Sequence, residues 1–172
     1  MKRFAALFLL ALELALCGCG NSNTSSTTTN TSASGNWEAQ LTGGTGQASL
    51  LNFVTGFDVT NSGPLTVTGF SFINAGACFV TVGTESGSAT LTTDATNNVT
   101  GTLTFTVQSG TPAGNTLTLN GTALTGTSSS GKLSGGAVTG TWTLTGGAGD
   151  PSCANQTGNF TLCQNAATCS TT

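Results

Sequence analysis

From residue 36 onward, apolar and polar side chains alternate along the chain with a period of two. Leu103, Phe105 and Val107 alternate with threonines, and Trp142 and Leu144 do the same. This period places successive side chains on opposite faces of a β-strand, and no segment of this region shows a convincing 3.6-residue period of an amphipathic helix. One apolar and one polar face per strand is typical of antiparallel sheets. The pattern therefore predicts an all-β domain.

Clusters of Gly, Asn, Asp, Ser and Pro separate the alternating runs and predict turns. Asn61-Ser62-Gly63-Pro64 is one such cluster, and the segment from Asp94 to Asn98 offers asparagines that tolerate a positive φ. Around Gly69 the apolar register shifts, which predicts a β-bulge. The predicted strands are residues 36–42, 48–60, 64–73, 78–84, 88–94, 98–108, 115–124, 133–145 and 158–163.

Strands at this spacing, with no helix between them, predict an antiparallel meander of about eight strands. We expect it to close as an up-and-down barrel, with a β-sandwich as the alternative. Closure would hide the outer edges by placing Gly158-Asn159-Phe160-Thr161 beside Gly35-Asn36-Trp37-Glu38. We assign residues 36–172 to this domain, including a C-terminal tail clipped by a disulfide.

The N-terminal segment has a different pattern. Lys2 and Arg3 precede an apolar run from Phe4 to Leu16 that is interrupted only by Glu13. A helix of this length spans about 20 Å, less than the hydrocarbon core of about 30 Å. A carboxylate would also be costly inside a bilayer. Residues 1–18 are therefore predicted to be a cleaved signal peptide.

The end of this run, Leu16-Cys17-Gly18-Cys19, resembles the lipobox of bacterial lipoproteins, in which an apolar and a small residue precede the lipidated cysteine. The resemblance implies that Cys19 becomes the N-terminus and carries the acyl chains. Cys17 departs from the Ala or Ser usual at its position. Lipidation of Cys17 itself, or an ordinary secretory signal, are the alternatives. Because Gly20, not Asp, follows the anchor, the resemblance implies the outer membrane, on its periplasmic or surface face.

Residues 19–35 comprise the lipid anchor and the stretch that follows it, which is made almost entirely of Ser, Thr and Asn. Such a stretch has no side chain large enough to bury surface that would offset the entropy of ordering it. We therefore predict a disordered linker that tethers the domain to the membrane of the bacterial cell envelope through the lipid anchor.

Composition restricts the remaining chemistry. After the signal peptide the chain has one basic residue, Lys132, against five acidic residues, a net charge of −4. Phosphate binding depends on Lys and Arg, so no nucleic-acid partner is expected. Without any His, the Ser/His/Asp and Cys/His arrangements cannot form, and nothing in the spacing brings two carboxylates together. We therefore predict no enzymatic activity, no cofactor and no metal site.

Four cysteines, Cys78, Cys153, Cys163 and Cys169, belong to the predicted domain. An even number in an exported chain predicts two disulfides, for which three connectivities exist. We favour a Cys78–Cys153 bridge and a local Cys163–Cys169 clip on the tail. A metal site is disfavoured because the chain has neither a C-x-x-C motif nor a His ligand.

Two short motifs, Gly35-Asn36-Trp37 and Gly140-Thr141-Trp142, resemble the G-x-W strand starts of small barrels such as lipocalins and avidins. Lipocalins stack an Arg on this Trp, and avidins line their pocket with Tyr. The chain after its signal peptide has neither residue type, so we transfer no binding residue. Taken whole, the chain is more similar to Thr/Gly-rich bacterial lipoproteins with a small β domain.

Two functions remain open. The first is a structural or interaction role in the cell envelope without catalysis, for which we expect a filled interior and an exposed apolar patch. The alternative is a small-molecule or saccharide binding module that holds its ligand in the barrel mouth, near Trp37 or Trp142. An open cavity with a few convergent polar groups would favour this alternative. We predict the first; a protein or small-molecule partner is not specified by the sequence.

Overall fold

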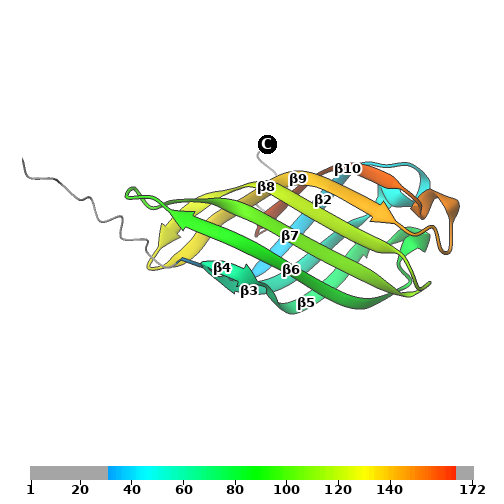
Figure 1. Ribbon diagram of the computed structural model, residues 1–172, viewed down its shortest axis with the longest axis horizontal. Helices are drawn as coiled ribbons and strands as arrows, with labels where there is room; N and C mark the ends of the chain where they lie inside the picture. Colours follow the sequence, from blue (N-terminus) through cyan, green and yellow to red (C-terminus); the bar gives the residue numbers. More distant parts are fainter. Residues whose placement is uncertain (1–30, 166–172) are drawn as a thin grey trace, which may run out of the picture.

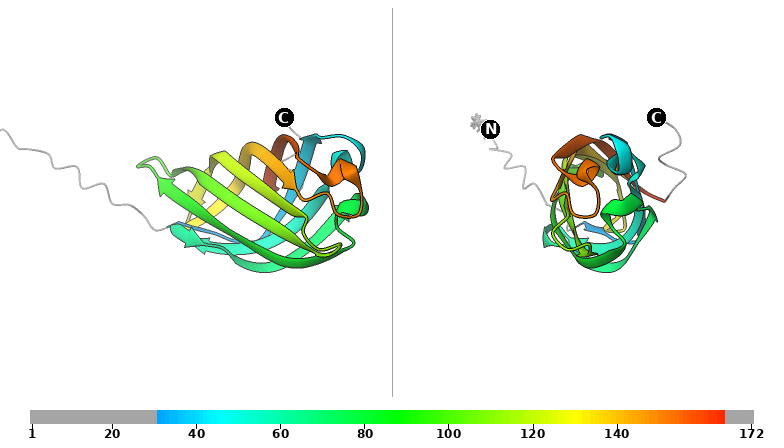
Figure 2. Two further views of the ribbon diagram at one scale, coloured as in Figure 1. Left: turned by 45° about the vertical axis from the view of Figure 1, so that its right-hand side comes forward. Right: turned by 90° about the vertical axis from the view of Figure 1, so that its right-hand side faces the viewer.

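The computed structural model describes residues 31–165, which fold as tilted strands wound around one core (Figures 1 and 2). The strands are β1 (Ser32–Ala33), β2 (Asn36–Gly43), β3 (Asn52–Thr60), β4 (Ser62–Pro64), β5 (Thr66–Asn74), β6 (Thr81–Thr93), β7 (Asn98–Thr111), β8 (Thr116–Ser129), β9 (Lys132–Thr145) and β10 (Gln156–Gln164). Three short 3₁₀ helices, η1 (Gly46–Leu50), η2 (Gly76–Cys78) and η3 (Pro151–Cys153), join strands at one end. Within this part of the chain no helix is long and apolar enough to span a bilayer.

The strands are hydrogen-bonded in the order β5–β3–β2–β10–β9–β8–β7–β6–β4, and all of these neighbours are antiparallel. Strands β4 and β5 form one segment interrupted only by Leu65, and this segment pairs first with β6 and then with β3. The short strand β1 pairs with β3 and also with β9, which closes a ring of five strands with the others outside it. The predicted all-β meander and barrel are thereby confirmed.

Several strand boundaries differ from the prediction by a few residues, and at two places the difference has a clear physical reason. Residues 78–84 and 88–94 do not form two strands, because β6 continues through Gly87. A Cβ on Gly87 would lie 2.3 Å from the carbonyl oxygen of Thr104, so this glycine permits close packing of β6 on β7 and makes no turn. The start of the predicted strand 48–60 instead lies in η1, where the Ser49 hydroxyl donates to the carbonyl of Gly46.

The predicted bulge near Gly69 is confirmed. Gly56 pairs with Gly69 and Phe57 pairs with Val67, so Thr68 is the extra residue on β5.

The first and last long strands also pair, as expected, but the expected register was wrong. Because β10 and β2 are antiparallel, Gly158 lies opposite Gly43, and it is Gln164 that lies opposite Trp37. The folded part also includes residues for which the sequence predicts a linker. Thr31 and Ala33 are each 1 % exposed, so both belong to the folded part.

The inward faces of the strands form one hydrophobic core that fills the interior. Its largest fully buried side chains are Trp37, Trp142, Phe53, Phe57, Phe105, Leu51, Leu103, Leu117, Leu119, Leu124, Leu144 and Leu162. Stacked rings bridge opposite walls, and the Phe53 and Phe105 centroids are 5.7 Å apart. Since each large apolar side chain contributes about 1.5–3 kcal/mol on burial, this packed interior is the main stabilising feature.

The outward face is polar and, over most of the barrel, uncharged. One cross-strand row runs through six adjacent strands, and it consists of the exposed residues Ser88, Thr104, Asn120, Thr141, Asn159 and Thr42. Thr and Ser are thus the solvent-facing partners of the buried Leu, Phe and Trp positions, as the alternation predicted.

A disulfide and a buried asparagine hold together the barrel end that carries the 3₁₀ helices. The Cys78–Cys153 disulfide joins η2 to η3 with 5.5 Å between the Cα atoms, which confirms the predicted pairing. The Asn115 side chain is only 1 % exposed. Its Nδ2 donates to the carbonyls of Cys78 (2.9 Å) and Ala148 (2.8 Å), while its Oδ1 accepts from the N–H groups of Gly147 (2.9 Å) and Ala148 (3.0 Å).

Candidate functional site

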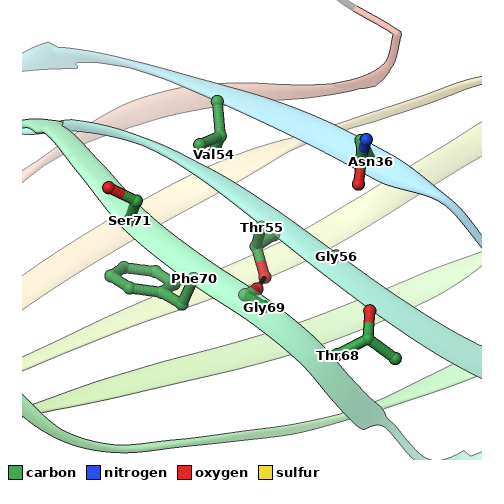
Figure 3. A pocket seen from close by; sticks show the side chains of 8 residues that line it. All are labelled: Asn36, Val54, Thr55, Gly56, Thr68, Gly69, Phe70 and Ser71. Atoms are coloured by element: carbon green, nitrogen blue, oxygen red, sulfur yellow. Dashed lines mark hydrogen bonds between the residues drawn. The ribbon is translucent and has the colours of Figure 1, made fainter.

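A groove of about 390 Å³ lies on the outer wall of the barrel, across strands β2, β3 and β5 (Figure 3). It is lined by Asn36, Val54, Thr55, Gly56, Thr68, Gly69, Phe70 and Ser71. Its volume falls within the range of about 300–1,000 Å³ that is typical of small-molecule sites. The groove is therefore the candidate site of the described chain.

Two glycines on adjacent strands form the floor of the groove. Gly56 of β3 lies between Asn36 of β2 and Gly69 of β5 in the sheet. Both glycines occupy outward positions, but Gly56 is buried beneath the Thr68 side chain whereas Gly69 is exposed. A Cβ built on Gly69 would meet no atom within 4 Å, so the space above this residue is open.

Two polar side chains converge over the floor. A Cβ on Gly56 would lie 2.6 Å from Thr68 Oγ1 and 3.5 Å from Asn36 Oδ1. Figure 3 shows these two oxygens pointing toward each other across β3. Thr68 takes this position because it is the bulged residue, and bulges redirect the side chain that they carry. Within residues 31–165 neither side chain has a hydrogen-bond partner in the protein, so both face solvent.

The opposite side of the groove is formed by the cross-strand pair Val54 and Ser71. Val54 is 38 % exposed and supplies the apolar contact surface, while the Ser71 hydroxyl makes only a long bond of 3.4 Å to a neighbouring carbonyl. Thr55 is only 2 % exposed, and its hydroxyl donates to the carbonyl of Gly69 at 3.1 Å. This bond fixes the backbone of β5 at the bulge.

The groove contains no ionisable side chain. In the described part of the chain no three His, Cys, Asp or Glu side chains gather closely enough to hold a metal ion. Two carboxylates are engaged in turns. The Thr96 hydroxyl, together with the backbone and side chain of Asn98, lowers the pKa of Asp94. The Ser152 hydroxyl and N–H lower the pKa of Asp150.

Trp37 and Trp142, the predicted ligand-contact residues, lie inside the core and away from the groove. Trp37 is 1 % exposed and stacks on Phe57, with 5.0 Å between the ring centroids. Trp142 is fully buried and donates its indole N–H to the carbonyl of Thr42 at 3.0 Å. A ligand could reach either indole ring only if core side chains moved. Contact of Trp37 or Trp142 with a ligand therefore stays a prediction.

The other predicted site residues are cysteines. Cys78 and Cys153 form the disulfide described above. Cys163 lies in β10 and is disulfide-bonded, while its expected partner Cys169 lies outside the described residues. Cys19, the expected lipidation site, also lies outside them.

The groove residues themselves were not anticipated from the sequence as a site. The available signal was a pair of glycines, Gly56 and Gly69, inside otherwise alternating strands. Glycine within a strand marks either a bulge or a close approach by another group. That these glycines face outward and lie opposite each other depends on the β3–β5 register, which the sequence alone does not specify.

No family model matches this chain, and comparisons with curated proteins and with solved structures give no match. Function is therefore inferred from the residues of the chain itself.

Proposed function

We propose that this protein is a lipid-anchored component of the bacterial cell envelope, with a structural or interaction role and no catalytic activity. The filled interior is the observation that carries the proposal. Trp37 and Trp142 occupy the volume in which a barrel of this kind would hold an internal ligand. The outer wall then becomes the surface available to partners.

The lipid anchor is supported by the sequence Leu16-Cys17-Gly18-Cys19 and by the polar stretch that follows it. The geometry of the barrel is compatible with such a tether. Strand β1, where the described chain begins, lies at the end of the barrel opposite the three 3₁₀ helices (Figure 1). A tethered barrel would thus present its side wall and its disulfide-bridged end away from the membrane.

A non-catalytic role is supported by the distribution of ionisable groups. Lys132 begins β9 next to Ser32 of β1, at the end of the barrel far from the 3₁₀ helices. Asp94 and Asp150 accept hydrogen bonds within their own turns. General acid–base chemistry needs a titratable side chain positioned beside the substrate, whereas Asp94 and Asp150 serve local backbone structure.

Metabolic labelling tests the anchor. The full-length chain is expressed in a Gram-negative bacterium that is fed an alkyne fatty acid, alongside Cys19→Ser and, as a matched control, Cys17→Ser. We expect acylation of the wild type and of Cys17→Ser, and none of Cys19→Ser. An unlabelled wild-type protein, or a Cys19→Ser variant that keeps its label, contradicts the proposed anchor.

Intact-mass and complementation measurements test the role. Native mass spectrometry of protein purified from the envelope should show an acylated chain with no small molecule enclosed in the barrel. In a deletion strain, wild-type protein should restore the envelope barrier to detergent and Cys19→Ser should fail to do so. A retained ligand that is released only by denaturation would argue instead for an internal binding site.

A further inference from the structure

At some strand glycines of this barrel the fold itself requires the absence of a side chain, because a Cβ would lie 2.3 Å or less from a backbone carbonyl oxygen. This group comprises Gly87, Gly101, Gly140 and Gly158. The groove glycines differ, since a Cβ on Gly69 meets nothing within 4 Å and one on Gly56 comes closest to Thr68 Oγ1, within the groove. The bulge at Thr68 accounts for a glycine at position 69, and the same glycine leaves the space above the sheet open to a ligand.

The polar groups around this floor have a common chemistry. The carboxamide of Asn36 and the hydroxyls of Thr68 and Ser71 each combine donor and acceptor capacity. All three side chains are exposed, and they surround the floor from two sides. Sugar hydroxyls also donate and accept at the same atom, so they are complementary to these three side chains. The groove lining itself has no charged side chain. Glu38 of β2 lies opposite Val54, and this neighbouring acidic side chain disfavours an anionic ligand.

The floor also discriminates between ligand shapes. Strand β3 is hydrogen-bonded to β2 on one side and to β5 on the other, so its backbone is not free to pair with an added peptide strand. The two side-chain-free positions leave a ledge, and the Val54 methyl groups border it. A compact ring with apolar C–H faces and a polar edge fits these features.

We propose that the groove over Gly56 and Gly69 binds a neutral saccharide. One sugar ring lies on the glycine floor with a C–H face against Val54, and its hydroxyls bond to Asn36, Thr68 and Ser71. This inference goes beyond the proposed function, because the groove is formed by the barrel whether or not the chain is lipidated.

Binding is tested by NMR on the full-length protein in a detergent that contains no sugar. The probes are N-acetylglucosamine, chitobiose, maltose and cellobiose, with glucuronic acid as a charged comparison. We expect at least one neutral sugar to shift the Gly56 and Gly69 amides and the Asn36 side-chain amide in a saturable manner, and glucuronic acid to leave them in place. No saturable shift from any of the four sugars at 50 mM overturns the proposal.

Gly69→Ala is the decisive variant, because it fills the space above the floor without touching another atom of the fold. We expect at least a tenfold loss of sugar affinity together with an unchanged or slightly raised melting temperature. Ser71→Ala should weaken binding about threefold to tenfold, the effect of roughly one hydrogen bond. Ser88→Ala, which alters an equally exposed serine outside the groove, should leave binding unchanged.

Wild-type affinity in Gly69→Ala overturns the proposed site, because a ligand on the floor would meet the added methyl group. Equal losses in Ser71→Ala and Ser88→Ala overturn it as well. Acylation of Cys19 is measured on the same preparations, so that failure of the saccharide site is distinguishable from failure of the lipid anchor.

Discussion

Asn115 lies where three loops meet at the disulfide-bridged end of the barrel, and Asn115→Ala removes all of its side-chain hydrogen bonds at once. The carboxamide makes four bonds, two as donor and two as acceptor. Its capacity is therefore fully used. The substitution leaves two carbonyls, of Cys78 and Ala148, and two N–H groups, of Gly147 and Ala148, without these partners.

The expected loss follows from these four groups. Each hydrogen bond contributes about 0.5–1.5 kcal/mol net, and a polar group left buried and unpaired costs about 1–3 kcal/mol. Because the loops can relax and admit some water, we expect the free energy of unfolding to fall by about 3–5 kcal/mol. For a domain of this size such a loss lowers the melting temperature by about 10–15 °C.

Asn115→Asp is the matched comparison, because it keeps the shape and both acceptor bonds but loses both donors. Burial, together with the facing carbonyls of Cys78 and Ala148, will raise the pKa of the introduced carboxyl group above its value in the unfolded chain. A folded-state pKa raised in this way makes the variant most stable below the unfolded pKa of about 3.9. Its stability then falls as the pH rises through the higher folded pKa.

Urea denaturation followed by tryptophan fluorescence at pH 4 and pH 7 measures both effects. Relative to the wild type, Asn115→Ala should show nearly the same loss at the two pH values, whereas Asn115→Asp should lose more at pH 7. A loss below about 1 kcal/mol for Asn115→Ala would refute the reasoning. Parallel pH profiles for the two variants would refute it as well.

Three further predictions concern other parts of the barrel. Replacing both cysteines of the Cys78–Cys153 bridge by alanine releases a loop of 75 residues and should lower the free energy of unfolding, measured by urea denaturation, by about 4 kcal/mol. A loss under about 1 kcal/mol would show that this bridge adds little stability. Trp142→Phe should lower the free energy of unfolding by about 1 kcal/mol more than Trp37→Phe does. The reason is that Trp142 donates its N–H to a β2 carbonyl, whereas the buried Trp37 N–H has no acceptor among residues 31–165. Equal losses in the two variants would contradict this prediction. An NMR titration should place the Asp94 pKa below 3.8, because the hydroxyl of Thr96 is the strongest of several donors to the carboxylate. Its stabilising effect is thus present above pH 3.8 and disappears as the pH falls through the lower folded value, a dependence that Asp94→Asn should abolish.

Local alternation was sufficient to predict most of the strands. Leu103, Phe105 and Val107 all face the core because a strand turns every second side chain inward. The bulge near Gly69 was predictable from a register shift, and an even number of cysteines predicted disulfides, among which the favoured Cys78–Cys153 pair forms. These features depend on short patterns, and short patterns are visible in a single sequence.

Features that depend on contacts between distant strands were not predictable. Gly87 resembles a turn residue until its distance to Thr104 on the next strand is known. Ala33 is buried because β3 and β9 flank strand β1, although its own neighbours in the chain are polar. The groove needs the Gly56–Gly69 register and a bulge that turns Thr68 over the floor, and neither follows from composition.

The hydroxyl and amide row that crosses six strands of the outer wall has a consequence for how the protein meets its surroundings. None of these side chains carries a charge or titrates between about pH 4 and pH 9. Salt screens interactions between exposed charges over about 10 Å at 0.1 M, and the row has no charge to screen. The chemical character of this row is therefore the same at low and high salt and in mild acid or base.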